Sequence, residues 1–447
     1  MSEFPPASFS PSAPQMSWRP LLDGSLGRQA VACVCAIVDD LAANRRNMDE
    51  EPSLADGHAG WAILSCYLAE ANHGNEDHRS HQRRTAQASL GHAIEKMQER
   101  PAAAALYGGL TGLGWAIAHL RHFLPGMNGD EALAEIDEVL LTHLEETPWT
   151  GEYDLIGGLV GYAVYALEHL PSPAGVACLE HIIDHLEQTA ERRPEGLTWW
   201  TNPKLLAAET REEWPGGYYN LGLAHGVPGV IAVLGRVCAA GIAVDRARPL
   251  LDGAVRWLLA HQNCDGFANW VAPDHPEKPA RLAWCYGDPG VAAALLAAAR
   301  AVDEPAWERE ARAIALRAAE RPVDQSGVKD AGLCHGAAGL GHIFNRMYQA
   351  TDDSRLADAA RDWFERTLAM RRPGQGIGGF ETWMPRDNGS SKWVADPGLL
   401  TGAAGIALAL LAATTPVEPA WDAMLLVAIP PARQRFKIPE ISGPARR

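Results

Sequence analysis

Apolar runs rich in Ala and Leu recur along the whole chain, and each follows a short pattern of a glycine, two further residues and a second glycine. The pattern occurs seven times, at intervals of about 50 to 70 residues, a period typical of repeats built from two helices. Ala and Leu favour helices, and between the motifs apolar residues recur at helical spacing, as at Leu356, Ala360 and Trp363. The seven motifs begin at Gly57, Gly109, Gly158, Gly226, Gly287, Gly336 and Gly402.

The repeats predict an all-α fold of seven helical hairpins, arranged either as an open solenoid or as a closed double ring of helices, the α/α toroid. A solenoid normally ends in polar capping repeats, yet the last copy, residues 402–413, is as apolar as the middle copies. We therefore expect the ring to close. The expected domains are a disordered N-terminal arm (1–20), the α/α-toroid domain (21–430) and a C-terminal tail (431–447).

Composition narrows the class of protein. Hydrophobic residues make up 47% of the chain and charged residues 21%, a balance typical of a globular protein with a large core. The formal net charge of −16 argues against a nucleic-acid partner or an anionic membrane surface. No strongly apolar run is long enough to predict a membrane span, and the N-terminus lacks the features of a secretory signal. Eight cysteines are too few to form a dense disulfide framework in so long a chain. This fits a reducing compartment, so we expect a cytoplasmic protein.

Alignment of the repeats on their first glycine places polar residues in shared columns. Cys285 and Cys334 occupy one column in adjacent repeats, and the next column holds His335 in one of these repeats and His225 in the repeat before them. Equivalent positions lie at the same end of the ring, so we expect these side chains to converge. The alternative is that both cysteines are ordinary buried residues, as we expect for the other six.

Two thiolates and one imidazole are soft ligands that suit Zn²⁺, and three protein ligands leave a fourth position open, as in catalytic zinc sites. The sequence therefore predicts one catalytic zinc ion per chain. Zinc lowers the pKa of a thiol that binds it, so a substrate thiol in the open position would become a nucleophile at neutral pH.

Three segments around these residues resemble the signature motifs of the lanthionine synthetase C family: 223–229, 284–290 and 334–336. The resemblance extends from about Gly57 to Gly405. It implies an α/α toroid in which Cys285, Cys334 and His335 hold zinc. The implied reaction is a Michael addition of cysteine thiols of a precursor peptide to dehydroalanine or dehydrobutyrine, which forms lanthionine and methyllanthionine thioether rings.

Further positions resemble active-site residues of that family. Asp154 matches an active-site aspartate, His225 an acid/base histidine and Arg281 an active-site arginine. An acid near neutral pKa, such as His225, suits protonation of the enolate that follows sulfur attack. Arg281 could hold the developing negative charge or the peptide carbonyl, and Asp154 could orient His225 or pair with Arg281. Tyr286, beside a metal ligand, could hydrogen-bond near the metal. The alternatives are a helix cap for Asp154, a surface charge for Arg281 and a packed ring for Tyr286.

Two long intervals between motifs are candidates for peptide binding. Residues 196–220 are rich in Trp and Tyr, and residues 374–393 are rich in glycine. Aromatic side chains at the ring mouth could hold an extended peptide, or these segments could fill the ring. The partners that the resemblance implies are a dehydrated precursor peptide and a separate dehydratase that prepares it.

Three other functions remain open at the sequence level. A prenyltransferase-like α/α barrel also activates a cysteine thiol on zinc, but it would need a basic pocket for a diphosphate, and no basic cluster lies near the zinc columns. A related enzyme that adds a small thiol such as glutathione is a closer alternative. A catalytically silent, peptide-binding scaffold is the third, although it has no need of a zinc site with an open position.

Overall fold

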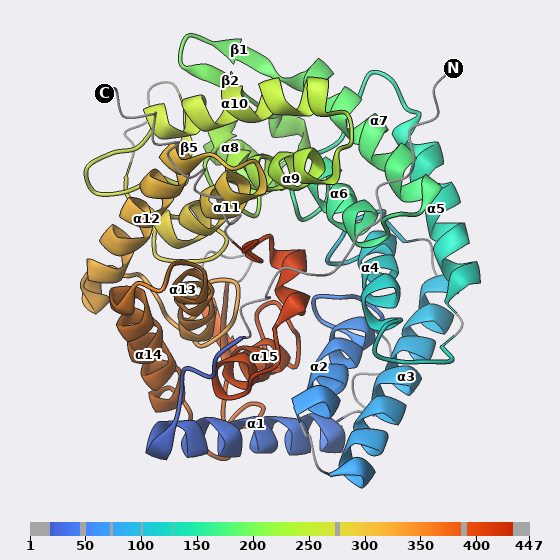
Figure 1. Ribbon diagram of the computed structural model, residues 1–447, viewed down its shortest axis with the longest axis vertical. Coiled ribbons are helices and arrows are strands. Elements are labelled where there is room, and N and C mark those ends of the chain that lie inside the picture. Colours follow the sequence, from blue (N-terminus) through green and yellow to red (C-terminus); the bar gives the residue numbers. More distant parts are fainter. Residues whose placement is uncertain are drawn as a thin grey trace, which may run out of the picture.

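The computed structural model describes residues 18–44, 51–71, 75–99, 102–127, 129–272, 278–385 and 391–431. Its helices form two concentric rings, as Figure 1 shows along the shortest axis of the molecule. The inner ring consists, within the described chain, of α2 (His58–Ala71), α4 (Leu110–Leu120), α6 (Leu159–Glu168), α9 (Val227–Ala240), α11 (Asp288–Ala301), α13 (Ala337–Thr351) and α15 (Ala403–Thr414). The outer ring consists of α1 (Gly24–Asn44), α3 (Glu76–Gln98), α5 (Asp130–Leu144), α7 (Pro173–Thr189), α10 (Val244–Ala260), α12 (Pro305–Glu320) and α14 (Ser354–Ala369).

The ring closes, and the α/α toroid predicted from the repeats is confirmed. Each inner helix packs against the next, and the last, α15, packs against the first, α2. The outer partner of α15 is α1, so the seventh helix pair joins the two ends of the chain. Trp18 strengthens this junction because its buried indole Nε1 donates a 2.7 Å hydrogen bond to the carbonyl of Ala412. Residues 1–17 of the expected arm and 432–447 of the expected tail lie outside the described residues.

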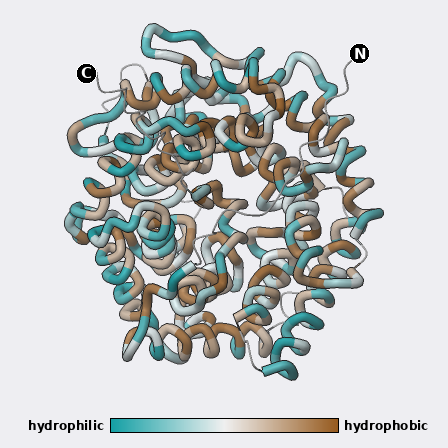
Figure 2. The backbone as a smooth tube through the Cα atoms, in the orientation of Figure 1, coloured by the Kyte–Doolittle hydropathy of each residue, from teal (hydrophilic) through white to brown (hydrophobic). Residues whose placement is uncertain are grey.

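Hydrophobicity explains which helices lie inside. Every residue of α11, and every residue of α15 from Ala403 to Ala413, is buried, and apart from Asp288 and Arg300 near the ends of α11 these residues are apolar or small. The outer helices bury only one face. In α14, for example, Leu356, Ala360 and Phe364 face the core while charged residues face solvent. Figure 2 shows the same distribution, with hydrophilic residues concentrated along the outer rim.

The glycines of the repeated motif allow the loop before each inner helix to fold back onto the start of that helix. A methyl group on the second glycine would overlap the carbonyl oxygen of the residue six positions earlier in every repeat; at Gly290 this residue is Trp284. At the first glycine, Gly287 adopts a φ of 88°, a left-handed conformation that favours glycine. The motif therefore encodes a tight loop and helix start.

Backbone hydrogen bonds link these loops from repeat to repeat around the ring mouth. The N–H of Ala224 donates to the carbonyl of Cys285, Cys285 donates to Cys334, and Cys334 donates to Leu400. Leu400 in turn donates to Ala55 of the first repeat. We call this series the mouth belt. It joins the residues two positions before the first glycine, and it fixes the separation of the two cysteines predicted to bind metal.

The chain after α15 fills the centre of the ring, where Figure 1 shows it in red. Its 3-10 helix η4 (Ala420–Leu425) buries Asp422, which pairs with Arg346 and His342 of α13. Trp284, next to Cys285, donates to the carbonyl of Leu425. The segment is therefore an internal plug below the mouth. Among the described helices, none combines the length and apolarity of a membrane span.

Short strands occupy the long intervals between motifs. In one sheet, β4 lies between β3 and β5, with Trp200 opposite Tyr219 and Tyr219 opposite Val271. A short helix, α8 (Ala208–Glu213), connects β3 to β4. The strands are β1 (Glu191–Arg193), β2 (Gly196–Thr198), β3 (Trp200–Thr201), β4 (Tyr218–Asn220), β5 (Trp270–Val271), β6 (Thr382–Pro385) and β7 (Ser391–Val394). The hairpins β1–β2 and β6–β7 are antiparallel.

Candidate active site

Three potential metal ligands converge at the ring mouth. The ligand atoms of Cys285, Cys334 and His335 all lie within 4.8 Å of one another, and they form a cluster that could hold a metal ion. Cys285 precedes α11 and Cys334 precedes α13. The mouth belt holds both in place, since the N–H of Cys285 donates a 3.3 Å hydrogen bond to the carbonyl of Cys334.

The two thiols are electrostatically coupled. Cys334 and His335 stabilise the Cys285 thiolate by hydrogen bonding and hold its pKa well below the ordinary range, even though burial opposes ionisation. Arg281 contributes, with Nη2 3.8 Å from the Cys285 sulfur. The pKa of Cys334 is raised because it faces that thiolate and is buried. A bound cation would allow both thiols to ionise side by side. The two thiols and the imidazole therefore fit a divalent metal that prefers sulfur and nitrogen.

Asp330 supports the imidazole of the cluster. Its Oδ2 lies 3.7 Å from Nε2 of His335 and accepts a 3.0 Å hydrogen bond from the N–H of Trp383. Its Oδ1 accepts from the N–H of Gly332 at 3.2 Å. The carboxylate is therefore buried and fixed on both sides, a position from which it can orient a metal-binding histidine.

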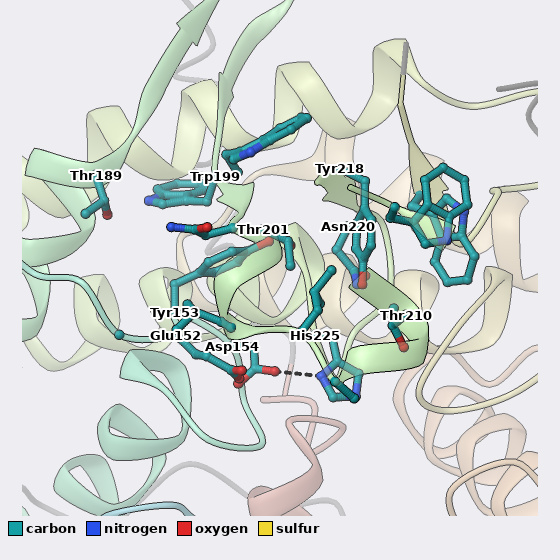
Figure 3. A pocket seen from close by; sticks show the side chains of 18 of the residues that line it. Glu152, Tyr153, Asp154, Thr189, Trp199, Thr201, Thr210, Tyr218, Asn220 and His225 are labelled. Carbon is teal, nitrogen blue, oxygen red and sulfur yellow. Dashed lines mark hydrogen bonds and ion pairs between the residues drawn. The ribbon is translucent and has the colours of Figure 1, made fainter. Parts of the chain in front are cut away.

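His225 forms a close pair with Asp154. The distance from His225 Nδ1 to Asp154 Oδ2 is 2.6 Å (Figure 3). Oδ1 of the same carboxylate accepts a 2.9 Å hydrogen bond from the N–H of Gly157. The surrounding protein opposes protonation of His225, but the hydrogen bond and charge of Asp154 outweigh that effect and raise its pKa. Asp154 therefore holds the imidazole in one orientation and favours its acid form.

Tyr286 lies between the histidine pair and the metal cluster. Its ring stacks on that of His225 with centroids 6.1 Å apart, and Asn220 Nδ2 donates a 3.1 Å hydrogen bond to its hydroxyl. Burial raises the pKa of the Tyr286 hydroxyl, which therefore stays neutral. The structure thus brings together every site residue expected from the sequence.

A cavity of about 630 Å³ opens beside the His225–Asp154 pair. Its wall includes Trp200 from β3, Tyr218 from β4, Trp270 from β5 and Trp214, which follows α8. The aromatic interval 196–220 therefore lines a cavity next to the site. Residues 374–393 instead form a turn and the β6–β7 hairpin, and positions 386–390 lie outside the described residues.

Glu152 also lines this cavity. Burial and the nearby Asp154 carboxylate raise its pKa to about 7. Glu152 belongs to no recognisable motif by itself, so it was not predicted as a site residue from the sequence.

A family model of lanthionine synthetase C-like proteins matches residues 49–426. The chain belongs to this family. Among curated proteins it is similar to the nisin biosynthesis protein NisC of Lactococcus lactis subsp. lactis, with 24% identity over 261 residues. That match covers 53% of this chain and 60% of the relative's length. A solved structure of nisin cyclase shares the fold with a TM-score of 0.71 and 19% identity, and the match covers 88% of this chain and 96% of that one.

In the repeats of this lanthionine synthetase C-like protein, the column six residues before the first glycine of the motif contains several residues of the site. Glu152, Asn220, Arg281 and Asp330 occupy it in consecutive repeats. Asn220 and Asp330 each accept a hydrogen bond from the N–H two residues later, so the column also shapes the loop. Comparison of this column was the signal that could have identified Glu152, Asn220 and Asp330 from the sequence.

Proposed function

We propose that this protein is a zinc-dependent lanthionine synthetase. In the proposed reaction, a cysteine thiol of a dehydrated precursor peptide adds to dehydroalanine or dehydrobutyrine in the same peptide and forms a thioether ring. The observation that carries the proposal is the convergence of two thiols and an imidazole within 4.8 Å in a member of this family, beside an acid/base pair.

Cys285, Cys334 and His335 would hold one zinc ion per chain. Zinc supplies Lewis acidity that converts a coordinated thiol into a thiolate at neutral pH. Arg281, beside the Cys285 sulfur, places positive charge where the peptide carbonyl or the developing enolate could be stabilised.

His225 supplies the proton that completes the addition. Sulfur bonds to the β-carbon of the dehydro residue, the carbon–carbon double bond opens, and negative charge moves to the α-carbon and its carbonyl oxygen. Because Nδ1 of His225 faces Asp154, Nε2 is the nitrogen that can deliver a proton to the α-carbon. Tyr286 packs against the imidazole and limits its rotation.

The substrate is a peptide that already contains dehydrated residues, so we propose that a separate dehydratase prepares it. The cavity beside His225 supports a peptide substrate, because its size and aromatic wall suit a large side chain. Its carboxylates disfavour an anionic small thiol such as glutathione. All eight cysteines are free thiols, which supports the expectation of a reducing, cytoplasmic setting.

The proposal is tested by incubation of the full chain with a dehydrated, cysteine-containing peptide. Remaining thiols are counted by alkylation and mass spectrometry, because cyclisation does not change the peptide mass. We expect thiols to disappear with the wild-type protein and with Cys264→Ala, an exposed cysteine outside the cluster, but not with Cys334→Ala. Persistence of thiols with zinc-loaded wild-type protein on several dehydrated peptides would contradict the proposal.

A further inference from the structure

The cavity beside His225 has a rigid aromatic wall. The rings of Trp214 and Trp270 meet edge to face with centroids 5.3 Å apart, and Trp214 meets Tyr218 in the same way at 5.6 Å. Trp199 and Trp200 line another part of the wall. Such edge-to-face packing fixes ring orientation, and the face of an indole carries negative electrostatic potential that attracts cations.

The charged groups in this wall are almost all acidic. Glu152, Asp154 and Glu213 line the cavity, and no Lys or Arg is among its lining residues in the described chain. The one basic group is His225, which is paired with Asp154. An empty cavity with this composition therefore has a negative potential.

Two arginines of the surrounding segments, Arg211 and Arg193, are engaged elsewhere. Arg211 of α8 donates its guanidinium to the backbone carbonyls of Pro203, Lys204 and Leu206. Arg193 donates to Glu191 and to the Tyr219 hydroxyl. These cations stabilise the loops around the cavity, and they do not neutralise the carboxylates inside it.

Glu152 is the carboxylate best placed to meet a ligand. It is partly buried, and its pKa of about 7 reflects burial and repulsion by Asp154. Its side chain hydrogen-bonds to Asp154, which is itself bonded to His225 and to the N–H of Gly157. A cation in the cavity would offset the repulsion at Glu152 and would stack on the indole faces.

We propose that this cavity binds a lysine or arginine side chain of the precursor peptide, with Glu152 as its ion-pair partner. This inference rests on the proposed function, because it takes the ligand to be the peptide that is cyclised. The basic residue would lie within a few positions of the dehydro residue, since His225 lines the same cavity. The subsite would thereby select which dehydro residue approaches the acid.

The test uses short model peptides that contain one dehydroalanine and a serine in place of the cysteine, so that they bind without reacting. Each peptide has one variable residue, which is lysine, norleucine or glutamate. In the series of peptides this residue stands in turn at each of the three positions on either side of the dehydroalanine. Binding to the full chain is measured by calorimetry. At the best position we expect lysine to bind roughly tenfold tighter than norleucine, and glutamate to bind more weakly than both.

Glu152→Gln should reduce the advantage of lysine over norleucine to about twofold or less while norleucine still binds. The matched control is Glu209→Gln, because Glu209 is an exposed carboxylate of α8 that does not line the cavity. Norleucine binding as tightly as lysine at every position would overturn the inference. So would an unchanged lysine preference in Glu152→Gln, or no binding by any of these peptides.

Cysteine-containing versions of the same peptides separate this inference from the proposed function. If their thiols disappear without a preference for lysine, the cation subsite is wrong and the cyclase proposal stands. If lysine peptides bind selectively but their thiols persist, the subsite stands and the cyclase proposal is wrong.

Discussion

His225 Nδ1 lies 2.6 Å from Asp154 Oδ2, although the two residues are 71 positions apart and belong to adjacent repeats. The contact exists because both residues precede inner helices that are neighbours in the ring, α6 and α9. A further backbone hydrogen bond joins the same two loops, since the N–H of Leu155 donates to the carbonyl of Ala224. The scaffold thus holds the imidazole of His225 and the carboxylate of Asp154 together before any ligand binds.

Asp154→Asn should lower the pKa of His225, because the hydrogen bond and charge of Asp154 raise it in the native protein. A raised pKa keeps the imidazole protonated to higher pH. Activity that needs this acid form should therefore decline at lower pH in Asp154→Asn than in the wild type. The measurement is a pH–rate profile of thiol loss, with an NMR titration of the imidazole; an unchanged profile would count against this role of Asp154.

His225→Ala should lower kcat by about 100-fold or more, a typical contribution of a general acid. Zinc content should stay the same, because His225 is not part of the cluster formed by Cys285, Cys334 and His335. Stopped-flow or timed-quench thiol counting gives the rate. A rate within a few-fold of wild type would exclude His225 as the proton donor.

Asp330→Asn should weaken zinc binding by about 10- to 100-fold, because a neutral amide orients and polarises the ligating imidazole less well than a carboxylate. The amide oxygen can still accept from the N–H of Gly332, but the NH2 group that replaces Oδ2 cannot accept from the N–H of Trp383. Competition with a chromogenic chelator measures the affinity. Equal affinities for the variant and the wild type would show that Asp330 only shapes the loop.

Asp422→Ala should lower the free energy of unfolding by about 3 to 5 kcal/mol, because it leaves His342 buried without its anion and leaves the buried Arg346 paired only with the exposed Glu418. Burial opposes ionisation of Asp422, but Arg346 and His342 outweigh it and lower the pKa. The ionised Asp422 carboxylate therefore stabilises the fold at neutral pH, and this stabilisation is lost on acidification, when the carboxylate is protonated.

Urea unfolding at neutral pH measures the cost of Asp422→Ala. The control is Asp358→Ala, whose exposed ion pair with Arg361 should contribute less than about 1 kcal/mol. A similar small effect for both variants would mean that the internal plug does not stabilise the ring.

The ring and the metal cluster were predictable because the repeat converts sequence offsets into positions in space. Gly287 and Gly336 begin equivalent helices, so Cys285 and Cys334 must lie at the same end of neighbouring inner helices. The steric demand at these glycines leaves a visible pattern in the sequence. The zinc ion and the catalytic roles remain predictions that the experiments above address.

Other features of the fold left no comparable pattern in the sequence. The sheet β3–β4–β5 joins two- and three-residue strands from separate loops, too short for any alternation of apolar and polar residues to be detected. The plug at η4 follows the last motif and obeys no repeat, so its buried Asp422 could not be aligned with anything. Closure of the ring was predicted, but α1 precedes the first motif, and its pairing with α15 had no pattern of its own in the sequence.

The most direct test of the central claim is the metal dependence of ring formation. Protein stripped of metal by a chelator is assayed on a dehydrated, cysteine-containing peptide before and after addition of one equivalent of Zn²⁺, and peptide thiols are counted by alkylation and mass spectrometry. We expect zinc to restore thiol loss in the wild-type protein but not in a variant in which Cys285 and Cys334 are both alanine. Equal thiol loss with and without zinc, or in the double variant, would contradict the account.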